Sequence, residues 1–181
     1  MLRVIAGTAR GHKLATPRSA ARPTLDRVRE AVFSILHTKL DGVRFLDLFA
    51  GSGANGIEAL SRGAAYCAFV DSDAQAIDII GKNLFHTKLT HKARSYQLTL
   101  PQSLGAIAST ESPFGIVYCD PPFAGTGYAQ LILQIVENQL LMPDGLLLIE
   151  HESHLQLPPS IGTLTRQRIS QYGRVGITFF A

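Results

Sequence analysis

From residue 43 onward, short apolar runs alternate with segments whose apolar residues recur at helical spacing. Strands that alternate with helices in this way are typical of an α/β fold, with a mostly parallel sheet and crossover helices on both faces. The turn into the last of these strands is expected at residues 143–145. The pattern predicts strands at 43–48, 65–71, 94–98, 114–119 and 145–151, and helices at 54–62, 73–89, 101–108 and 128–140.

Two further segments flank this alternation. Thr24 follows Pro23 and is expected to cap an amphipathic helix that runs to about residue 40. At the other end, residues 167–181 contain two strand-like runs on either side of Gly173, which predicts an antiparallel hairpin that closes an edge of the sheet.

The first residues have a different character. Residues 2–6 and 12–16 read as short strands with turn glycines between them, which predicts a β-hairpin. Residues 17–23 are rich in Pro, Ser, Ala and Arg and predict an extended linker. The expected organisation is therefore a hairpin and linker at 1–22, followed by one domain at 23–181.

Composition narrows the class of protein. The 181 residues are 46% hydrophobic with a mean hydropathy of +0.14, which suffices for one well-packed domain. No apolar run reaches the ~20 residues needed to span a bilayer, and residues 1–7 lack a signal-peptide pattern, so we expect a cytoplasmic protein. Cys67 and Cys119 both lie inside apolar runs, which predicts free core thiols rather than a disulfide.

Charge is concentrated at the N-terminus. The formal net charge is +3, but residues 1–30 carry seven Lys/Arg against two acidic residues, a balance of +5 that leaves −2 for the rest. A basic segment on a near-neutral body suits contacts with a phosphate backbone, although a solvated face explains the charge equally well.

A glycine-rich turn follows the predicted strand at 43–48. Gly51, Gly53 and Gly56 form the G-x-G-x-x-G pattern of a nucleotide-binding turn, and Asp71 ends the next strand, where a carboxylate can bind ribose hydroxyls. Asp47 lies just before the turn and would repel the pyrophosphate of a nicotinamide dinucleotide. A carboxylate there suits S-adenosylmethionine, which carries an ammonium and a sulfonium. The alternative is a tight turn without a ligand.

Asp120, Pro121, Pro122 and Phe123 follow the predicted strand at 114–119. Prolines lack N–H groups, so the backbone here offers only acceptors. Asp120 and the Pro121 carbonyl can accept both hydrogens of an exocyclic amine and direct its lone pair at a methyl group, while Phe123 stacks on the base. The alternative is a turn with a packed phenylalanine.

Other reactive residues lack a supporting context. His86 with His91, and the acidic and histidine residues at 150–154, do not form a convincing ligand set, so we expect no metal. Within the second group, Glu150 could line the mouth of the crevice. Cys119 alternates away from Asp120, which argues against a covalent cysteine mechanism. Tyr128 is either a lid on the base pocket or the first turn of a helix.

Taken together, these stretches resemble the S-adenosylmethionine-dependent methyltransferases that modify guanine N2 in bacterial small-subunit ribosomal RNA. The resemblance covers nearly the whole chain, and the two N-terminal stretches are its most specific part. It rests on RVIAGTARGHKL (3–14), RPTLDRVRE (22–30), FAGSG (49–53), EALSRGA (58–64) and DPPF (120–123).

The resemblance implies a Rossmann-like methyltransferase fold, S-adenosylmethionine as methyl donor and ribosomal RNA, within a small-subunit particle, as partner. We expect the protein to be a monomer. Asp120, Pro121, Pro122 and Phe123 would hold the guanine. The donor would be held by Asp47, Phe49, Gly51, Ser52, Gly53 and Asp71, with Thr24 and Arg27 near donor or target. The RNA would be contacted by Arg3, Arg10, His12, Lys13 and Arg22.

Two positions depart from the family pattern. Asn55 stands where the family more often has an aliphatic residue, and Thr99 stands near the position where an acidic or amide residue often contacts adenine. The DPPF stretch is shared with DNA adenine-N6 methyltransferases, which are the first alternative, although this chain has no separate target-recognition domain. A catalytically silent RNA-binding or assembly protein is the second, and a nicotinamide oxidoreductase the third.

Overall fold

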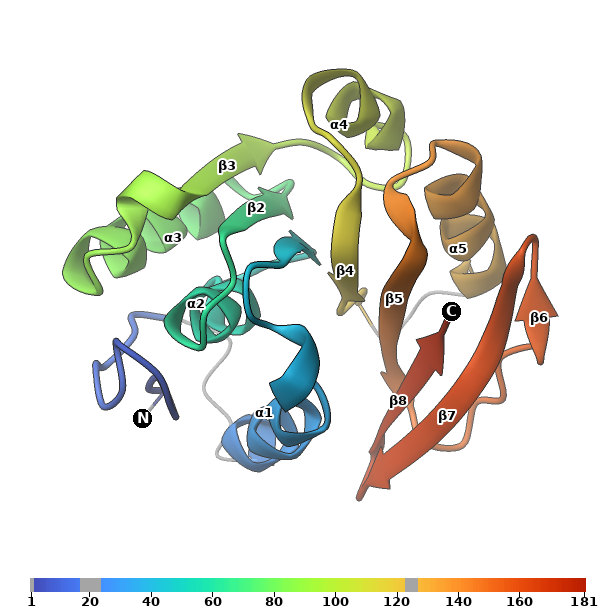
Figure 1. Cartoon of the computed structure of the whole chain (residues 1–181), viewed down its shortest axis with the longest axis horizontal. Coiled ribbons are helices and arrows are strands. Elements are labelled where there is room, and N and C mark those ends of the chain that lie inside the picture. Colours follow the sequence, from blue (N-terminus) through green and yellow to red (C-terminus); the bar gives the residue numbers. More distant parts are fainter. Residues whose placement is uncertain (1, 17–23, 123–126) are drawn as a thin grey trace. The chain divides into compact units, whose positions relative to one another are not determined.

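The computed structural model of the protein describes residues 2–16, 24–122 and 127–181 (Figure 1). The chain forms two compact units, Met1–Leu98 and Thr99–Ala181. The boundary that the sequence suggests at residue 22 stays a prediction.

The first unit is a parallel α/β layer whose strands follow the order β3-β2-β1. Helices connect each strand to the next, as the alternation of apolar runs and helical segments predicts. Its elements are α1 (Thr24–Ile35), η1 (His37–Lys39), β1 (Arg44–Leu48), α2 (Ala54–Ser61), β2 (Tyr66–Asp71), α3 (Ala74–His86), η2 (Thr90–Lys92) and β3 (Ala93–Gln97).

Helix α1 packs on β1 through Phe33, whose ring stacks on that of Phe45 with centroids 6.2 Å apart. The α-helix ends at Ile35, about five residues earlier than predicted, and the chain continues as a short 3₁₀ turn. Leu36 and Leu40 are nevertheless completely buried. The apolar spacing therefore predicts the buried positions correctly but not the length of the helix.

The second unit has strand order β4-β5-β8-β7-β6, with β4 and β5 parallel and the other pairs antiparallel. The hairpin predicted around Gly173 is confirmed, since β7 and β8 flank that glycine. The short β6, which pairs with β7, was not predicted. The elements are α4 (Leu104–Thr110), β4 (Phe114–Cys119), α5 (Tyr128–Glu137), β5 (Leu141–Glu152), β6 (Ser160–Ile161), β7 (Leu164–Tyr172) and β8 (Val175–Phe180).

Strand β5 begins earlier than predicted, so residues 143–145 are not a turn that precedes it. The register against β4 passes from Phe114 opposite Leu141 to Ile116 opposite Leu146, so β5 advances five residues while β4 advances two. An irregularity of this kind accommodates Pro143, which has no N–H to donate to a regular ladder.

The predicted N-terminal β-hairpin is wrong in detail. Instead of two regular strands, the segment has one isolated antiparallel bridge between Arg3 and Lys13. The ladder does not extend because the N–H groups of Ile5 and Ala6 bond the carboxylate of Glu58 in α2 rather than a second strand.

The state of the two cysteines and the lengths of the helices are both clear in the described residues. Cys67 and Cys119 are both buried and neither is part of a disulfide, as predicted. In the described part of the chain, no helix has the length and apolar character needed to cross a bilayer.

Candidate functional site

Asp47 is a buried carboxylate with only one oxygen bonded. It lies in β1 opposite Phe69 of β2 and is 1% exposed. Its Oδ2 accepts the Gly56 N–H at 2.9 Å, whereas Oδ1 has no hydrogen-bond partner among the described residues. Burial raises the pKa of Asp47 to about 8, against the opposing effect of the Gly56 N–H and with a further increase from Asp71. A proton or a cationic ligand would complete such a group.

The loop that follows β1 has a strained backbone. Phe49, Gly51 and Gly53 have φ angles of 59°, 53° and 74°. This left-handed region is unfavourable for a bulky side chain such as that of Phe49. Bonds from Ala50 N–H to the Val70 carbonyl (3.1 Å) and from Gly53 N–H to the Ala50 carbonyl (2.7 Å) hold the turn. Strain that the surroundings enforce in this way is typical of ligand-binding loops.

The glycines of this loop differ in their surroundings. A Cβ atom at Gly56 would lie 2.3 Å from Phe69 Cε1 and 2.6 Å from Cys67 Sγ, so this glycine lets α2 approach β2. A Cβ at Gly51 would meet no atom of the described residues within 4 Å. Gly51 therefore borders open space where a ligand can reach the backbone, whereas Gly56 is required by packing.

Asp71 connects the end of β2 to the same loop. Its Oδ2 accepts the Gly51 N–H at 2.8 Å and its Oδ1 accepts the Asp73 N–H at 2.9 Å. Each carboxylate oxygen can accept a further bond, so the half-buried Asp71 can still bind a hydroxyl group. Asp73 caps α3 by accepting the Gln75 N–H at 2.9 Å, as predicted.

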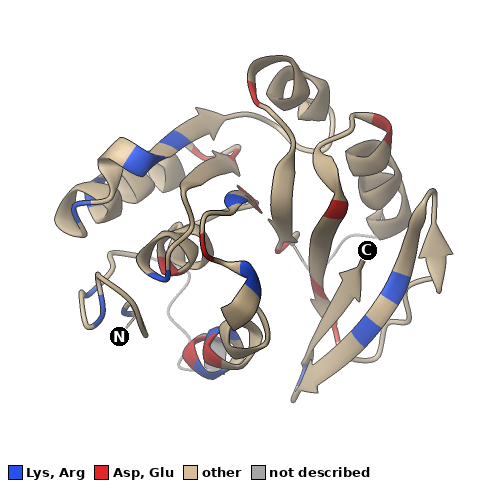
Figure 2. Ribbon diagram, in the orientation of Figure 1, with Lys and Arg blue, Asp and Glu red and all other residues tan. Residues whose placement is uncertain are grey.

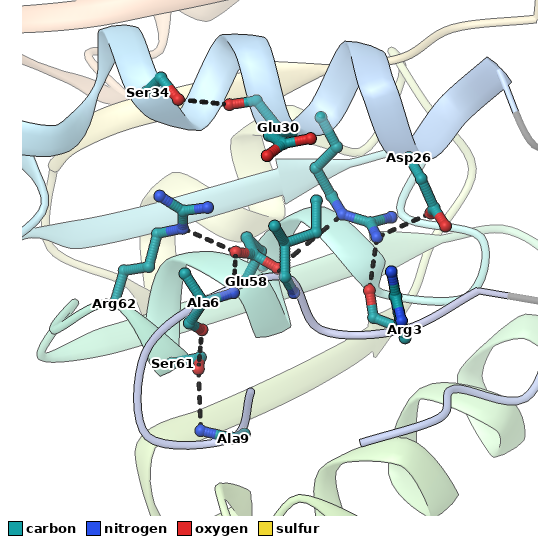
Figure 3. Close-up of polar contacts among 12 residues, drawn as sticks. Arg3, Ala6, Ala9, Asp26, Glu30, Ser34, Glu58, Ser61 and Arg62 are labelled. Atoms are coloured by element: carbon teal, nitrogen blue, oxygen red, sulfur yellow. Dashed lines mark hydrogen bonds and ion pairs between the residues drawn. The ribbon is translucent and has the colours of Figure 1, made fainter. Parts of the chain in front are cut away.

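Glu58 anchors the N-terminal segment to α2, as Figure 3 shows. The residue is fully buried, and it accepts the N–H groups of Ile5 and Ala6 at 2.8 and 3.0 Å. Arg62 donates to it at 2.6 Å, and Arg29 Nε lies 3.9 Å away. All the charge of this carboxylate is thus compensated by the protein.

Ser61 provides a second anchor for the segment. Its hydroxyl donates to the Ala6 carbonyl at 2.6 Å and accepts the Ala9 N–H at 2.9 Å (Figure 3). A Cβ at Gly7 would lie 1.8 Å from the Ser61 carbonyl oxygen, so only glycine fits there. These bonds use the backbone of the segment and leave Arg3, Arg10 and Lys13 exposed.

Asn83 of α3 links the segment to the glycine loop. Its Nδ2 donates to the carbonyl oxygens of Ala15 and Ser52 at 3.0 and 2.9 Å, and its Oδ1 accepts the Ala15 N–H at 2.8 Å. The predicted donor contact Ser52 is thereby held through its backbone. The role of Asn83 was not predicted, although a buried amide on the apolar stripe of Ile79, Ile80 and Leu84 is a signal for one.

The basic residues of the segment line a cavity of about 430 Å³ beside α1, formed by Arg3, Val4, Ile5, Arg10, Gly11, Asp26, Arg27 and Glu30. A second cavity, of about 410 Å³, shares Arg3, Gly11 and Asp26 and adds Lys13. Figure 2 shows that both the segment and α1 carry Lys or Arg. The structure thus brings Arg27 together with Arg3, Arg10 and Lys13.

His12 points elsewhere. Its Nδ1 bonds the Ala9 carbonyl at 2.9 Å, and its ring meets that of His86 edge-on at 5.2 Å. Among the described residues, no group of three His, Cys, Asp or Glu is placed to hold a metal ion.

In the second unit, Asp120 follows the carboxyl end of β4. Asp120 is half-buried, Pro121 is buried and Pro122 is exposed. Phe123 lies outside the described residues, and so do Arg22 and the side chain of Thr24 in the first unit. The stacking role, the RNA contact and the role of Thr24 therefore stay predictions.

A buried polar cluster lies next to this strand end. The Tyr118 hydroxyl donates to Glu150 Oε2 at 2.9 Å, and Glu150 is 4% exposed. Glu150 Oε1 and the Tyr128 hydroxyl have no hydrogen-bond partner among the described residues. Burial raises the pKa of Tyr128, and so do the carboxylates of Asp120, Glu152 and Glu150. Tyr128 lies in the first turn of α5, as one interpretation of the sequence expects, and this position leaves a role at the base pocket untested.

Comparison with known proteins gives this geometry a family context. The family model described as "Conserved hypothetical protein 95" matches residues 2–181. The "Putative rRNA methyltransferase YlbH" of Bacillus subtilis is 39% identical over 180 residues, which are 99% of this chain and 98% of the relative. The "Ribosomal RNA small subunit methyltransferase D" of Escherichia coli K12 is 36% identical over 93% of this chain and 85% of the relative.

Solved structures show the same fold. The "Putative methyltransferase yhhF" from Escherichia coli superposes with a TM-score of 0.85 at 34% identity, over 98% of this chain and 96% of that one. SMU.776, a putative methyltransferase complexed with SAH, shares the fold at 15% identity, with a TM-score of 0.70 over 88% of this chain and 50% of that one. The predicted Rossmann-like methyltransferase fold is therefore confirmed.

Proposed function

Because the chain belongs to the family described as "Conserved hypothetical protein 95", together with the small-subunit ribosomal RNA methyltransferases D, we propose that it methylates ribosomal RNA. The donor is S-adenosylmethionine, and the acceptor is the exocyclic N2 of a guanine in the small subunit. The observation that carries the proposal is the unpartnered buried oxygen of Asp47 beside the open Gly51 turn, both within the described residues.

The donor site has the charge that S-adenosylmethionine requires. A cationic group at Asp47 Oδ1 would complete the hydrogen bonding of this carboxylate and favour its ionised form. The ammonium of the methionine half is such a group, and Asp71 is placed to accept the ribose hydroxyls. When bound, the donor supplies an electrophilic methyl group on a sulfonium. Asp47 and Asp71 offer no positive charge to a pyrophosphate, which disfavours a nicotinamide cofactor.

The acceptor residues can orient the amine. Asp120 and the Pro121 carbonyl would accept the two N2 hydrogens, which leaves the nitrogen lone pair available to an incoming methyl group. As the C–N bond forms and the methyl–sulfur bond breaks, N2 loses one proton, and the Asp120 carboxylate is positioned to receive it. A base within a helix must first leave its stack.

The exposed cations beside α1 support an RNA substrate. Arg3, Arg10, Lys13 and Arg27 border the cavities described above, where phosphate oxygens could bind. Glu58 and Ser61 fix the backbone of the N-terminal segment at Ile5 and Ala9, so the side chains of Arg3 and Arg10 start from a defined position. We place the enzyme in the cytoplasm as a monomer that acts on a small-subunit particle.

The test is a transfer assay with labelled S-adenosylmethionine and small ribosomal subunits that lack the modification. The expected product is N2-methylguanosine, formed by the wild-type protein and lost in Asp120→Ala, which should still bind RNA. Transfer to adenine in DNA would instead establish the DNA adenine-N6 alternative. RNA binding without transfer by the wild-type protein would establish a silent assembly protein.

A further inference from the structure

The carboxyl ends of β4 and β5 place two carboxylates at the same level. The parallel register continues to Cys119 opposite Ile149, so the next residues, Asp120 and Glu150, come at the same height. Neighbouring strands are about 4.8 Å apart. Tyr118, which precedes Asp120 by two residues, donates to Glu150, so the Glu150 side chain lies on the Tyr118 face of the sheet.

Only one carboxylate oxygen of Glu150 has a hydrogen-bond partner among the described residues. Tyr118 completes Oε2, whereas Oε1 is buried and has no hydrogen-bond partner among the described residues. A buried carboxylate oxygen without a partner is unfavourable by itself, and the removal of water from this group raises the pKa of Glu150. An N–H donor supplied by a ligand would relieve both effects.

Tyr128 offers the complementary group. Its hydroxyl is buried, has no hydrogen-bond partner in the described part of the chain, and lies within the electrostatic influence of Asp120, Glu152 and Glu150. Burial and these charges raise the pKa of Tyr128, so the phenol stays protonated and remains a hydrogen-bond donor. The region around Asp120 therefore presents two carboxylate acceptors and one hydroxyl donor.

This set matches one nucleobase edge. The Watson–Crick edge of guanine presents the N2 and N1 hydrogens as donors and O6 as an acceptor. Adenine presents an acceptor at N1, which would face Glu150 without a hydrogen between them. Enzymes that act on an unstacked base read this edge through hydrogen bonds.

We propose that Glu150 and Tyr128 determine the specificity for guanine: Glu150 Oε1 accepts the N1 hydrogen and the Tyr128 hydroxyl donates to O6, while Asp120 holds the N2 amine. This assignment rests on the proposed guanine-N2 function. It adds the residues that would separate guanine from other bases bearing an exocyclic amine, which the DPPF stretch does not do by itself.

The substitution Glu150→Gln reverses the hydrogen bonding at the critical atom. The amide oxygen can still accept from Tyr118, which leaves the NH₂ group where Oε1 was. That NH₂ would oppose the N1 hydrogen of guanine but would donate to N1 of 2-aminopurine, a base that keeps the 2-amine and lacks the N1 hydrogen and O6. Tyr128→Phe removes only the donor to O6.

The experiment uses small subunits reconstituted with RNA that has guanine or 2-aminopurine at the position where the wild-type product is mapped. For Glu150→Gln, kcat/KM on guanine should fall about tenfold or more. The ratio of kcat/KM on guanine to kcat/KM on 2-aminopurine should fall by a similar factor relative to wild type. Tyr128→Phe should lose activity on guanine but little on 2-aminopurine. Because each ratio is compared with that of wild type, the intrinsic reactivity of the two amines cancels.

Glu152→Gln is the matched control, since it removes a partly exposed carboxylate that also acts on Tyr128. It should keep the wild-type ratio, and donor binding measured by calorimetry should be unchanged in all three variants. An unchanged ratio in Glu150→Gln, or equal wild-type rates on both bases, would overturn the assignment even if a variant folds poorly. Absence of any transfer to N2 by the wild-type protein would refute the proposed function instead.

Discussion

Two buried carboxylates of the first unit, Glu58 in α2 and Asp47 in β1, have nearly the same exposure, 0% and 1%, but different surroundings. Glu58 accepts two backbone N–H groups and is paired with Arg62 and Arg29. Asp47 accepts one backbone N–H and has no cation within its described surroundings that completes Oδ1. Since a buried charge is costly without partners, the first carboxylate is completed by the fold and the second requires a ligand.

The largest effect is expected for Glu58→Gln. The amide would present an N–H to the N–H groups of Ile5 or Ala6 and leave Arg62 and Arg29 without a buried counter-charge. Breaking a buried pair in this way typically costs about 3–5 kcal/mol, so the free energy of unfolding should fall by that amount. Urea denaturation measures it. As a control, Glu30→Gln changes an exposed carboxylate and should alter the free energy of unfolding by less than about 0.5 kcal/mol. An equally small effect of Glu58→Gln would show that the buried partners of Glu58 do not stabilise the fold.

Without S-adenosylmethionine, Asp47→Asn is expected to raise the free energy of unfolding rather than lower it. In the wild type, the carboxyl group of the unfolded chain has a pKa of 3.8, whereas burial raises the pKa in the folded protein to about 8. Ionisation therefore favours the unfolded state, and this residue lowers the free energy of unfolding as pH rises from about 4 to 8. Asparagine can still accept the Gly56 N–H and does not ionise.

The Asp47→Asn variant should accordingly be more stable than wild type by about 2 kcal/mol or more at pH 8, with a smaller difference at pH 5, since a tenfold change in a proton-binding constant corresponds to about 1.4 kcal/mol. Urea denaturation at several pH values checks it. Its affinity for S-adenosylmethionine should fall about tenfold or more, a loss of about 1.4 kcal/mol. A variant that loses stability and keeps donor affinity would show that Asp47 has a structural role like that of Glu58.

A smaller loss is expected for Asp73→Ala, because this residue is exposed and its carboxylate caps α3 through a single bond to the Gln75 N–H. Loss of an N-cap typically costs about 1 kcal/mol. Thermal unfolding should show this decrease, while Asp78→Ala, which removes only a solvent-exposed pair with Lys82, should change little. If Asp73→Ala lowered the free energy of unfolding as much as Glu58→Gln does, burial would not explain why the two carboxylates contribute differently to stability.

The sequence predicts what depends on local pattern. The strand that carries Asp47, the turn around Gly51 and the cap at Asp73 all follow from spacing within about ten residues. The hydrogen bonding of Glu58 cannot be predicted from local spacing, because its partners Ile5 and Ala6 are 53 and 52 residues away in the chain. The same long-range bonds explain why the predicted hairpin becomes a single bridge.

The second unit shows the same limit. The end of β4 just before Asp120 follows from its apolar run, whereas the pairing of Tyr118 with Glu150 joins residues 32 positions apart. Local pattern indicates only that Glu150 lies near the end of a predicted strand, where it could line the mouth of a crevice. Its half-satisfied state follows from the register of β4 and β5, which no local spacing specifies.

If S-adenosylmethionine completes the hydrogen bonding of Asp47, its binding should release a proton from this carboxyl group. Calorimetric titration near neutral pH in buffers of different ionisation enthalpy measures the number of protons released. If the donor ammonium pairs with Asp47, whose pKa in the donor-free protein is about 8, the wild type should release close to one proton more than Asp47→Asn. Equal proton release and equal affinity in the two proteins would show that S-adenosylmethionine does not pair with Asp47.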